Sequence, residues 1–413
     1  MPDKVSKISL NMETVSYVSI FTVIYIINPL LSIVLCVAKI LSDKKKGERY
    51  LFLLYAFIAI YLGLINSTKF IESDLLNYKY MFDLCKNVSL FEVVALKNKE
   101  PIFFAFTYSL NKIFFNNFSL YVIILTFIIY FNMFISIHRF WRYQTNSLFF
   151  VLFSITIFAL YHSFFINSTH LIRQVLAGSV FFIFLIERTV SGKVLWVCLP
   201  IAILIHSSSG VLFLLAFLPG IEKKISLKRL LLMFCIIGIA ILILDNLLGF
   251  LDGLTKNIPF LNYPFARLST IENYSRADMR DFVVGANPIG NVYIPLLFMA
   301  IGMGIYFTGH VKERIFGFIN IFIIFILIVF FLKIVGYLFI SLRLNIYTIF
   351  FMPFLIPYLI FIFEKKHINS FRIMGVLMLG FMLIYFVNYL PRSIWRYDPL
   401  SEIAVKPFLS FLL

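Results

Sequence analysis

The sequence predicts an all-α polytopic integral membrane protein with about 12 transmembrane helices, each near the 20 apolar residues that span a bilayer. Hydrophobic residues make up 61% of the 413 positions and charged residues only 14%. The mean hydropathy is +0.96, and long apolar runs recur from one end of the chain to the other. Helices suit such runs because they satisfy their own backbone groups in lipid. We therefore expect residues 1–413 to form a single transmembrane domain.

The charge balance supports the same class. The chain has 36 Lys and Arg against 20 Asp and Glu, a formal net charge of +16. In a soluble protein this excess would indicate a nucleic-acid partner. Here much of it lies in short loops between apolar runs, as in the stretch from Lys44 to Arg49. The positive-inside rule assigns such loops to the cytoplasm, and no nucleic-acid partner is predicted.

Keeping the basic loops inside determines the order of the spans. The first apolar run is too long for a signal-peptide core and is predicted to be a retained span. Both chain ends then lie outside. The predicted spans are residues 17–38, 51–66, 118–137, 148–165, 171–186, two short helices within 194–219, 230–249, 292–309, 315–332, 345–363 and 372–390.

Three segments depart from simple spans. Residues 67–116 are predicted to form an outer loop, in which 101–115 is a short interfacial or re-entrant helix started by Pro101. Residues 194–219 are predicted to bend at the turn that begins with His206, with a serine capping the second helix. Residues 251–290 form the longest polar segment and are predicted to be a large outer, periplasmic loop.

This topology gathers ionisable side chains on the outer face, where a site would face the periplasm or cell exterior. They are Asp74, Glu100, His162, His170, Arg173, His206, Arg343 and the tail from Arg392 to Asp398. The sequence shows no nucleotide-binding loop, metal-ligand cluster or serine-hydrolase elbow. Neither a metal nor a cofactor is therefore expected.

Two arginines are candidates for binding an anion. Arg173 lies at the predicted outer start of span 171–186, where helix N–H groups and a guanidinium fork together favour phosphate. Arg343 repeats this arrangement at the start of span 345–363. The alternative is that both arginines only extend to lipid headgroups at the membrane surface.

Candidate general bases are Glu100 and Asp74, because a carboxylate beside apolar helices can have a raised pKa. His206, at the bend of the predicted hairpin, is a third candidate. The alternatives are solvated loop carboxylates and a histidine bonded to a backbone carbonyl at a helix break. His162 and His170 flank a loop, where surface positions are ordinary.

Arginines and tyrosines in the 251–290 loop suit both pyrophosphate and sugar rings, although a loop of mixed charge is usually just solvated. The residues concerned are Arg267, Arg276, Arg280, Asp281, Tyr263 and Tyr274.

Several short motifs in this order resemble a known family. They are the acidic and aromatic stretch from Asp74 to Tyr80, Glu100-Pro101, Arg173-Gln174-Val175-Leu176-Ala177, His206-Ser-Ser, and Arg343 with Tyr347. With these motifs the chain resembles the EpsG-like and Wzy-type polysaccharide polymerases over roughly residues 70 to 350, and the order of the motifs carries the resemblance.

The resemblance implies a helical fold like that of class C glycosyltransferases (GT-C-like), by analogy, in the bacterial cytoplasmic (inner) membrane. It implies a donor glycan on undecaprenyl pyrophosphate, an acceptor repeat unit on the same lipid, contact with membrane lipids, and a chain-length regulator as a further partner. Arg173 and Arg343 would stabilise the leaving pyrophosphate without a metal, and Glu100, Asp74 or His206 would be the base. Further contacts to pyrophosphate or glycan would come from Arg276, Arg280, His170, Tyr78 and Tyr347.

Two other functions remain open. A flippase for lipid-linked oligosaccharides would also carry cationic groups for pyrophosphate, but in a central cavity reachable from both sides. An O-antigen ligase would use similar chemistry with a different acceptor.

Overall fold

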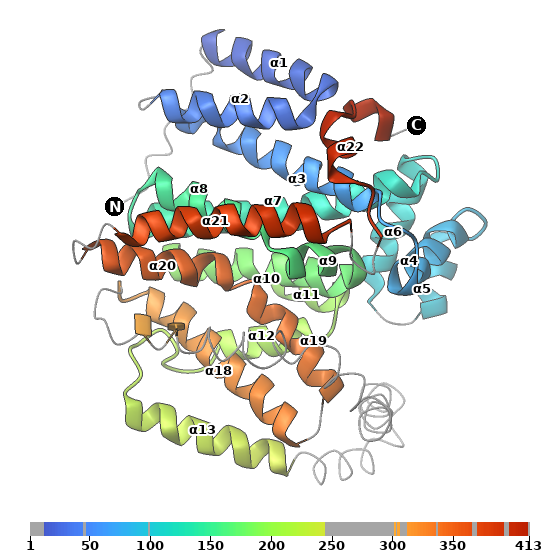
Figure 1. Cartoon of the computed structure of the whole chain (residues 1–413). Helices are drawn as coiled ribbons and strands as arrows, with labels where there is room; N and C mark the ends of the chain where they lie inside the picture. The colour runs from blue at the N-terminus through green and yellow to red at the C-terminus, as the bar shows by residue number, and fades with distance from the viewer. Residues whose placement is uncertain are drawn as a thin grey trace. The chain divides into compact units, whose positions relative to one another are not determined.

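The computed structural model describes residues 12–43, 47–97, 100–243, 301–302, 304–305, 312–335, 338–365, 370–391 and 396–411. Within these ranges the regular elements are α-helices and short 3-10 helices (Figure 1). The predicted span 292–309 and the predicted loop 251–290 fall largely or wholly outside the described residues.

The chain divides into two compact units. Unit 1 comprises Met1–Phe134, Ala159–Ile172 and Gly380–Leu413, and unit 2 comprises Ile135–Phe158 and Arg173–Leu379. The single transmembrane domain stays a prediction, and each unit is described by itself.

Unit 1 begins with a helical hairpin of α1 (Met12–Ile27) and α2 (Pro29–Ser42). The predicted span 17–38 is therefore wrong. Asn28 separates the helices, and its side-chain oxygen accepts a hydrogen bond from the Leu31 N–H (2.9 Å), which caps α2 behind Pro29. The hydroxyl of Ser32 donates to the carbonyl of Phe21 (2.7 Å), so the helices pack together. The Asn-Pro pair inside the apolar run is the sequence feature that could have predicted this break.

The predicted span 51–66 is confirmed as α3 (Leu51–Ser67). The segment that follows, predicted to lie outside, contains three helices, α4 (Ser73–Leu84), α5 (Leu90–Lys97) and α6 (Pro101–Ile113). The predicted helix starting at Pro101 is thus confirmed, whereas its interfacial position stays a prediction.

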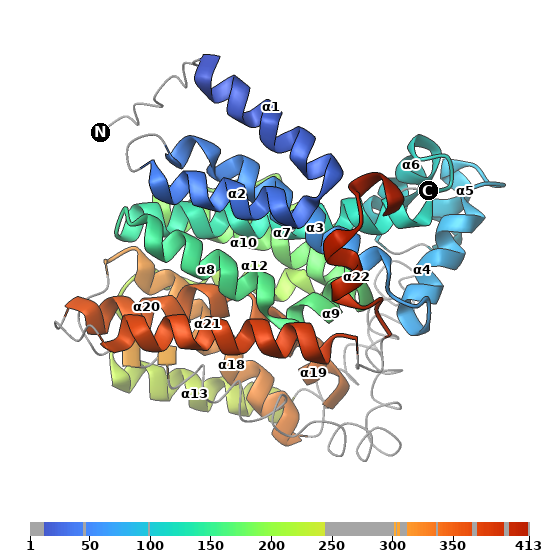
Figure 2. The ribbon, with the colours of Figure 1, turned by 45° about the horizontal axis from the view of Figure 1, so that its top comes forward.

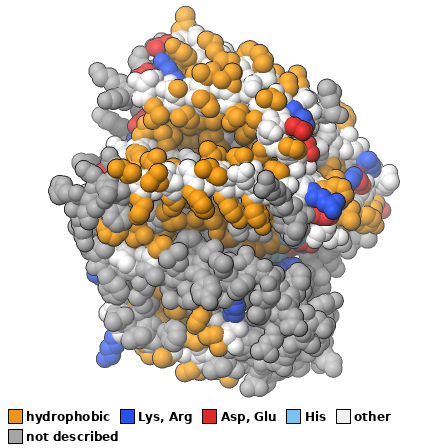
Figure 3. All heavy atoms as spheres, in the orientation of Figure 1, with side chains coloured by type: hydrophobic (Ala, Val, Ile, Leu, Met, Phe, Trp, Pro, Cys, Tyr) orange, Lys and Arg blue, Asp and Glu red, His pale blue; other side chains and the backbone are white. Residues whose placement is uncertain are grey.

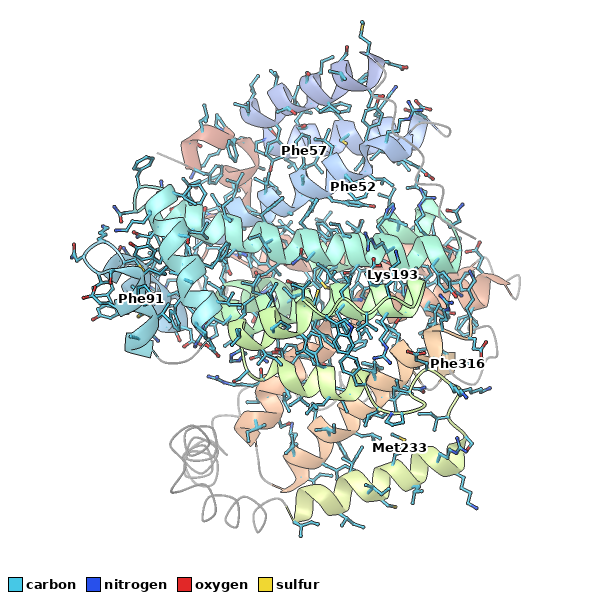
Figure 4. The ribbon with its side chains drawn as sticks, turned by 180° about the vertical axis from the view of Figure 1, so that it is seen from behind. Phe52, Phe57, Phe91, Lys193, Met233 and Phe316 are labelled. Carbon is cyan, nitrogen blue, oxygen red and sulfur yellow. The ribbon has the colours of Figure 1, made fainter. Side chains whose placement is uncertain are left out.

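Helices α4, α5 and α6 lie side by side in unit 1 (Figure 1). The rings of Tyr78 and Phe103 meet edge to face at 5.8 Å, and the Asn111 amide donates to the Phe82 carbonyl (2.8 Å). Figure 4 shows Phe91 at the margin of this group, where its side chain is 87% exposed.

Helix α7 (Phe118–Gln144) is longer than the predicted span 118–137. Residues 138–144, predicted to be a cytoplasmic loop, continue the helix. Phe140 and Trp141 in this stretch are almost fully buried, so the buried apolar face of the helix extends past Arg139. The predicted span 148–165 is a broken pair, α8 (Leu148–Leu160) and α9 (His162–His170), bent by 58°.

Unit 2 contains the helices that carry the candidates Arg173 and Arg343. They are α10 (Ile172–Ser191), α11 (Cys198–Ile205), α12 (Ser209–Ala216), α13 (Leu227–Leu242), α18 (Ile315–Val335), α19 (Leu338–Ile349) and α20 (Met352–Lys365). Helices α13 and α18 run side by side (Figure 2). Gly238 permits this contact, because a Cβ there would lie 2.9 Å from the ring of Phe331.

The predicted hairpin within 194–219 is confirmed, since α11 and α12 meet at His206. The predicted serine cap is wrong. Ser208 precedes α12 but makes no side-chain cap, because its hydroxyl lies 2.9 Å from that of Tyr347.

Helix α21 (Ser370–Tyr389) confirms the predicted helix 372–390 and exposes a largely apolar surface. Leu377 and Phe381 are 68% and 69% exposed. Figure 3 shows hydrophobic side chains spread over the described surface, as lipid contact requires.

The described residues contain four helices long and apolar enough to cross a membrane, or up to six if each bent pair is one span. The bent pairs are α8 with α9 and α19 with α20, the latter bent by 48°. These numbers agree with a polytopic membrane protein, and the predicted total of twelve stays a prediction.

Candidate functional site

In unit 2, α10 packs against α19 and α20, and the helices run in the same direction. The Gln174 side-chain amide donates to the backbone carbonyl of Arg343. One turn later on α10, Gly178 lies against Tyr347 and Phe350, where a Cβ would come within 2.7 Å of the Phe350 ring. Contacts that advance together along both helices mean that both begin at the same end of unit 2.

This parallel packing brings Arg173 and Arg343 to one end of unit 2. Arg173 lies in the first turn of α10, as predicted. The predicted helix-start position of Arg343 is wrong, because α19 begins at Leu338 and Arg343 lies in its second turn. The apolar residues just before Arg343 continue the helix toward its N-terminus. Both arginine residues are half-buried.

The tip of the α11–α12 hairpin joins the same end. His206 is 9% exposed and terminates α11 with extended backbone. Ser208 lies close by in the chain, and its hydroxyl contacts the Tyr347 hydroxyl at 2.9 Å. Tyr347 is itself fully buried against Gly178. Its contacts favour a positioning role over direct binding of substrate.

The segments that meet here are positively charged. Residues 172–186, 198–216 and 338–349 include Arg173 and Arg343 but contain no Asp or Glu. The field of these segments therefore attracts anions.

Unit 1 has its own polar cluster, at the end of α3. Lys69 is only 3% exposed, and its ammonium lies 3.3 Å from the Thr169 hydroxyl of α9. The Asn66 amide donates to the Ser168 hydroxyl (2.8 Å), and the hydroxyls of Thr169 and Tyr397 lie 3.5 Å apart. The end of α3, the end of α9 and the C-terminal tail thus meet around buried polar groups.

Burial lowers the pKa of Lys69 to about 8, and the negative charges of Glu72 and Asp74 partly oppose this shift. The sequence analysis missed Lys69. A lysine directly after an apolar span is ordinarily exposed at the membrane surface, and only the positions of α9 and the tail make this one buried.

Two sequence-predicted residues come close together in the same cluster. The Nε2 atom of His170 lies 3.9 Å from a carboxylate oxygen of Asp74. This is an electrostatic distance, longer than a hydrogen bond. The histidine side chain is 19% exposed and the aspartate side chain 39%, so both groups remain accessible.

The C-terminal tail lies against the segment after α3. The Phe70 N–H donates to the Arg396 carbonyl (2.9 Å), and the Asp398 N–H donates to the Thr68 hydroxyl (3.4 Å). These contacts make the tail and residues 68–70 neighbours, whereas the predicted position of the tail and Asp74 on the outer face stays a prediction. Arg392 lies outside the described residues.

Glu100 precedes α6 in an unusual backbone conformation. It is 7% exposed and left-handed, with φ 58° and ψ 50°. This conformation costs a non-glycine residue roughly 1–2 kcal/mol. The following proline disfavours the ordinary helical alternative. Such strain at a buried acid supports its candidacy as a functional group.

Other candidates take different positions. Tyr78 is buried between α4 and α6, one turn beyond Asp74. His162 packs edge to face against Tyr385 and Tyr389, which favours a structural role. The loop candidates Arg267, Arg276, Arg280, Asp281, Tyr263 and Tyr274 lie outside the described residues.

The length and apolar composition of its helices indicate that this chain is a membrane protein. The model of the EpsG family matches residues 50–398, most of the chain, and the chain therefore belongs to the EpsG family. The match confirms the family resemblance that the motifs indicated over roughly residues 70 to 350, and it extends further toward both ends of the chain. The family consists of polysaccharide-polymerase-like membrane proteins with glycosyltransferase-like activity. No curated protein and no solved structure matches the chain, and the GT-C-like fold stays a prediction.

Proposed function

We propose that this protein is a polysaccharide polymerase that joins undecaprenyl-pyrophosphate-linked repeat units on the outer face of the bacterial cytoplasmic membrane. The observation that carries the proposal is the parallel packing of α10 with α19, which brings Arg173 and Arg343 to one end of unit 2. Two arginines in segments without acidic residues suit a dianionic pyrophosphate.

In the proposed reaction an acceptor hydroxyl attacks the anomeric carbon of the donor glycan. The bond to polyprenyl pyrophosphate breaks, the leaving group takes the bonding electrons, and the hydroxyl proton passes to a base. The barrier has two components, the negative charge that develops on the leaving oxygen and the poor nucleophilicity of the acceptor hydroxyl. Arg173 and Arg343 would stabilise that charge, an effect worth about 2.7–4 kcal/mol for one well-placed donor.

Asp74 is our first choice as the base, because His170 lies beside it and can orient its carboxylate. Glu100, buried and strained, and His206 stay alternatives. Glycan contacts from Tyr78, Arg276 and Arg280, and a chain-length regulator as partner, are also part of the proposal.

The test is the polysaccharide ladder of a deletion strain complemented with wild type, Arg173→Ala or Arg343→Ala. Arg229→Ala is the matched control, because Arg229 is an exposed cation on α13 of the same unit. We expect normal ladders with wild type and the control, and a single-repeat band with either arginine variant at equal expression.

The deletion strain separates the other functions. A single-repeat band in the deletion establishes a polymerase. If the deletion leaves no sugar-bearing band at all, the protein is a flippase or a ligase and the proposal fails. An unchanged ladder with both arginine variants would remove the leaving-group role.

A further inference from the structure

A cavity of about 140 Å³ lies in unit 2 at the carboxyl end of α10. At a rise of 1.5 Å per residue, it is about 22 Å along the helix from Arg173. It is therefore separate from the proposed polymerase residues. Polar residues in its walls include Arg188, Thr189, Glu222 and Arg314.

Arg188 lines this cavity and carries an unsatisfied donor. Its Nε donates to a Glu222 carboxylate oxygen (2.9 Å), but its Nη1 is buried and has no hydrogen-bond partner among the described residues. An unsatisfied buried N–H of a charged group is costly, and a bound anion would relieve that cost.

A second guanidinium lines the same cavity. Arg314 donates to the carbonyl of Val190 (3.1 Å), the residue just before the end of α10. Gly192 follows with φ +71°, a conformation that favours glycine, and a Cβ there would lie 3.8 Å from the Arg314 guanidinium. The absence of a side chain at Gly192 keeps space open beside Arg314.

The rim of the cavity is basic. Exposed lysines flank its lining residues in the chain, next to Gly192, Glu222 and Arg314. They are Lys193, Lys223, Lys224 and Lys312. Lys224 lies over the ring of Phe316 at 5.9 Å, and Figure 4 shows Lys193 and Phe316 toward the same end of unit 2. Glu222 and the exposed Glu313, between Lys312 and Arg314, neutralise only part of this charge.

Exposed apolar side chains adjoin the basic rim. Trp196 is 65% exposed and stacks on Phe217 at 5.3 Å, and the Arg188 guanidinium lies 5.0 Å from the same Phe217 ring. On α12, Leu214 is 73% exposed. Tryptophan favours the boundary between headgroups and acyl chains, so this arrangement matches the two parts of a phospholipid.

We propose that this cavity binds the phosphate of an anionic phospholipid from the surrounding bilayer. Arg188 and Arg314 hold the phosphate oxygens, the lysines of the rim add attraction, and the acyl chains lie along Trp196 and Leu214. A free phosphate would use the arginines but would gain nothing from the apolar side chains. This site is independent of the proposed polymerase activity.

Native mass spectrometry of the purified full-length protein tests the proposal with three probes, phosphatidylglycerol, phosphatidylcholine and inorganic phosphate. We expect phosphatidylglycerol to bind the wild type about tenfold more tightly than phosphatidylcholine, because only the former leaves net negative charge for the arginines. Arg314→Gln and the paired variant Arg188→Gln/Glu222→Gln should lose that preference. Arg229→Gln, which makes the same charge change at an exposed position of α13, should keep the preference for phosphatidylglycerol.

Trp196→Ala distinguishes the lipid from free phosphate. It should weaken phosphatidylglycerol binding several-fold without affecting inorganic phosphate. Equal binding of the two lipids, or a preference that survives in Arg314→Gln, overturns the proposal. Displacement of phosphatidylglycerol by stoichiometric inorganic phosphate would assign the cavity to free phosphate instead. Because Arg314 is exposed, its variant tests the site even if the paired variant does not fold.

Discussion

At the amino end of α10, Arg173 and Arg343 lie in segments that contain no acidic residue, beside the positive end of a helix dipole. At the carboxyl end the dipole favours cations, and arginines there pair with carboxylates, Arg139 with Glu187 and Arg188 with Glu222. Arginines at the carboxyl end thus lie in the favourable direction of the dipole, whereas Arg173 at the amino end lies against it. An arginine in an unfavourable position points to an anionic ligand, which is why the amino end is the better candidate for pyrophosphate chemistry.

The largest expected effect is at the amino end. Arg173→Ala should reduce the polymerisation rate by about 10²–10³, the loss typical of one electrostatic donor to a developing negative charge. Arg173→Lys should retain part of the rate, because it keeps the charge but loses the bidentate fork. Polymer synthesis from lipid-linked repeat units by purified protein measures the rates of both variants. Equal rates for wild type and Arg173→Ala would contradict a special role for the amino end of α10.

A pH profile tests a third cation, Lys69 of unit 1. Its pKa of about 8 lies below the ordinary 10.5, so its charge is present at pH 7 and is lost as pH rises through 8. If this charge assists the reaction, the rate should fall about tenfold per pH unit above 8. Lys69→Arg should remove that decline, since arginine stays protonated.

As pH rises, folding stability should change in the opposite direction to the reaction rate. Between pH 8 and 10.5 Lys69 is protonated in the unfolded chain but mostly neutral in the folded one. The contribution of Lys69 to folding stability therefore improves with rising pH in that window. Below pH 8 the buried charge of Lys69 lowers the free energy of unfolding by an amount that no longer changes with pH. Thermal denaturation of wild type and Lys69→Met at pH 7 and pH 9.5 checks this sign, and the variant should show the smaller gain.

Gly178→Val should disturb the parallel packing that aligns the two arginines. The Cβ position lies 2.7 Å from the Phe350 ring, and overpacking of this kind costs about 1–3 kcal/mol. We expect a lower thermal midpoint and a loss of polymer together. Gly380→Val on α21 is the control, because nothing lies within 4 Å of its Cβ position. Equal effects of the two variants would contradict the close α10–α19 contact.

The hydroxyl pair of Ser208 and Tyr347 should contribute less. A double-mutant cycle with Ser208→Ala and Tyr347→Phe should give a coupling of about 0.5–1.5 kcal/mol, the net value of one hydrogen bond. Chemical or thermal denaturation supplies the four stabilities. A coupling of zero would mean that the hairpin tip is not held to α19 by this contact.

The smallest effect belongs to the carboxyl end. The Arg139 side chain is 50% exposed, so Arg139→Ala should cost at most about 1 kcal/mol, as for other exposed ion pairs. Polymer length should not change. A loss of polymer as large as that of Arg173→Ala would contradict the comparison between the two ends.

The sequence was sufficient for several elements of the fold. Span 51–66, the helix starting at Pro101, Arg173 in a first turn and the hairpin at His206 each depend on local signals such as an apolar run, a proline or a polar break. Span 17–38 failed because the Asn28-Pro29 break lies inside an otherwise uniform apolar run. The proposed serine cap failed because Tyr347, distant in the chain, takes the Ser208 hydroxyl.

Some features of the candidate site could likewise be predicted from the sequence, and others only from the structure. The resemblance to the family and the charge of the α10 and α19 segments follow from the order of residues alone, since motif order and composition are local properties of the chain. The burial of Lys69, the closeness of Asp74 to His170 and the alignment of Arg173 with Arg343 depend on contacts between residues about 100 to 330 positions apart. Each needs two helices to pack in one particular register, and a contact of that kind leaves no periodic trace in either segment. Composition and local pattern therefore determined the class of protein and its helices, whereas long-range packing decided which of its charged groups share a site.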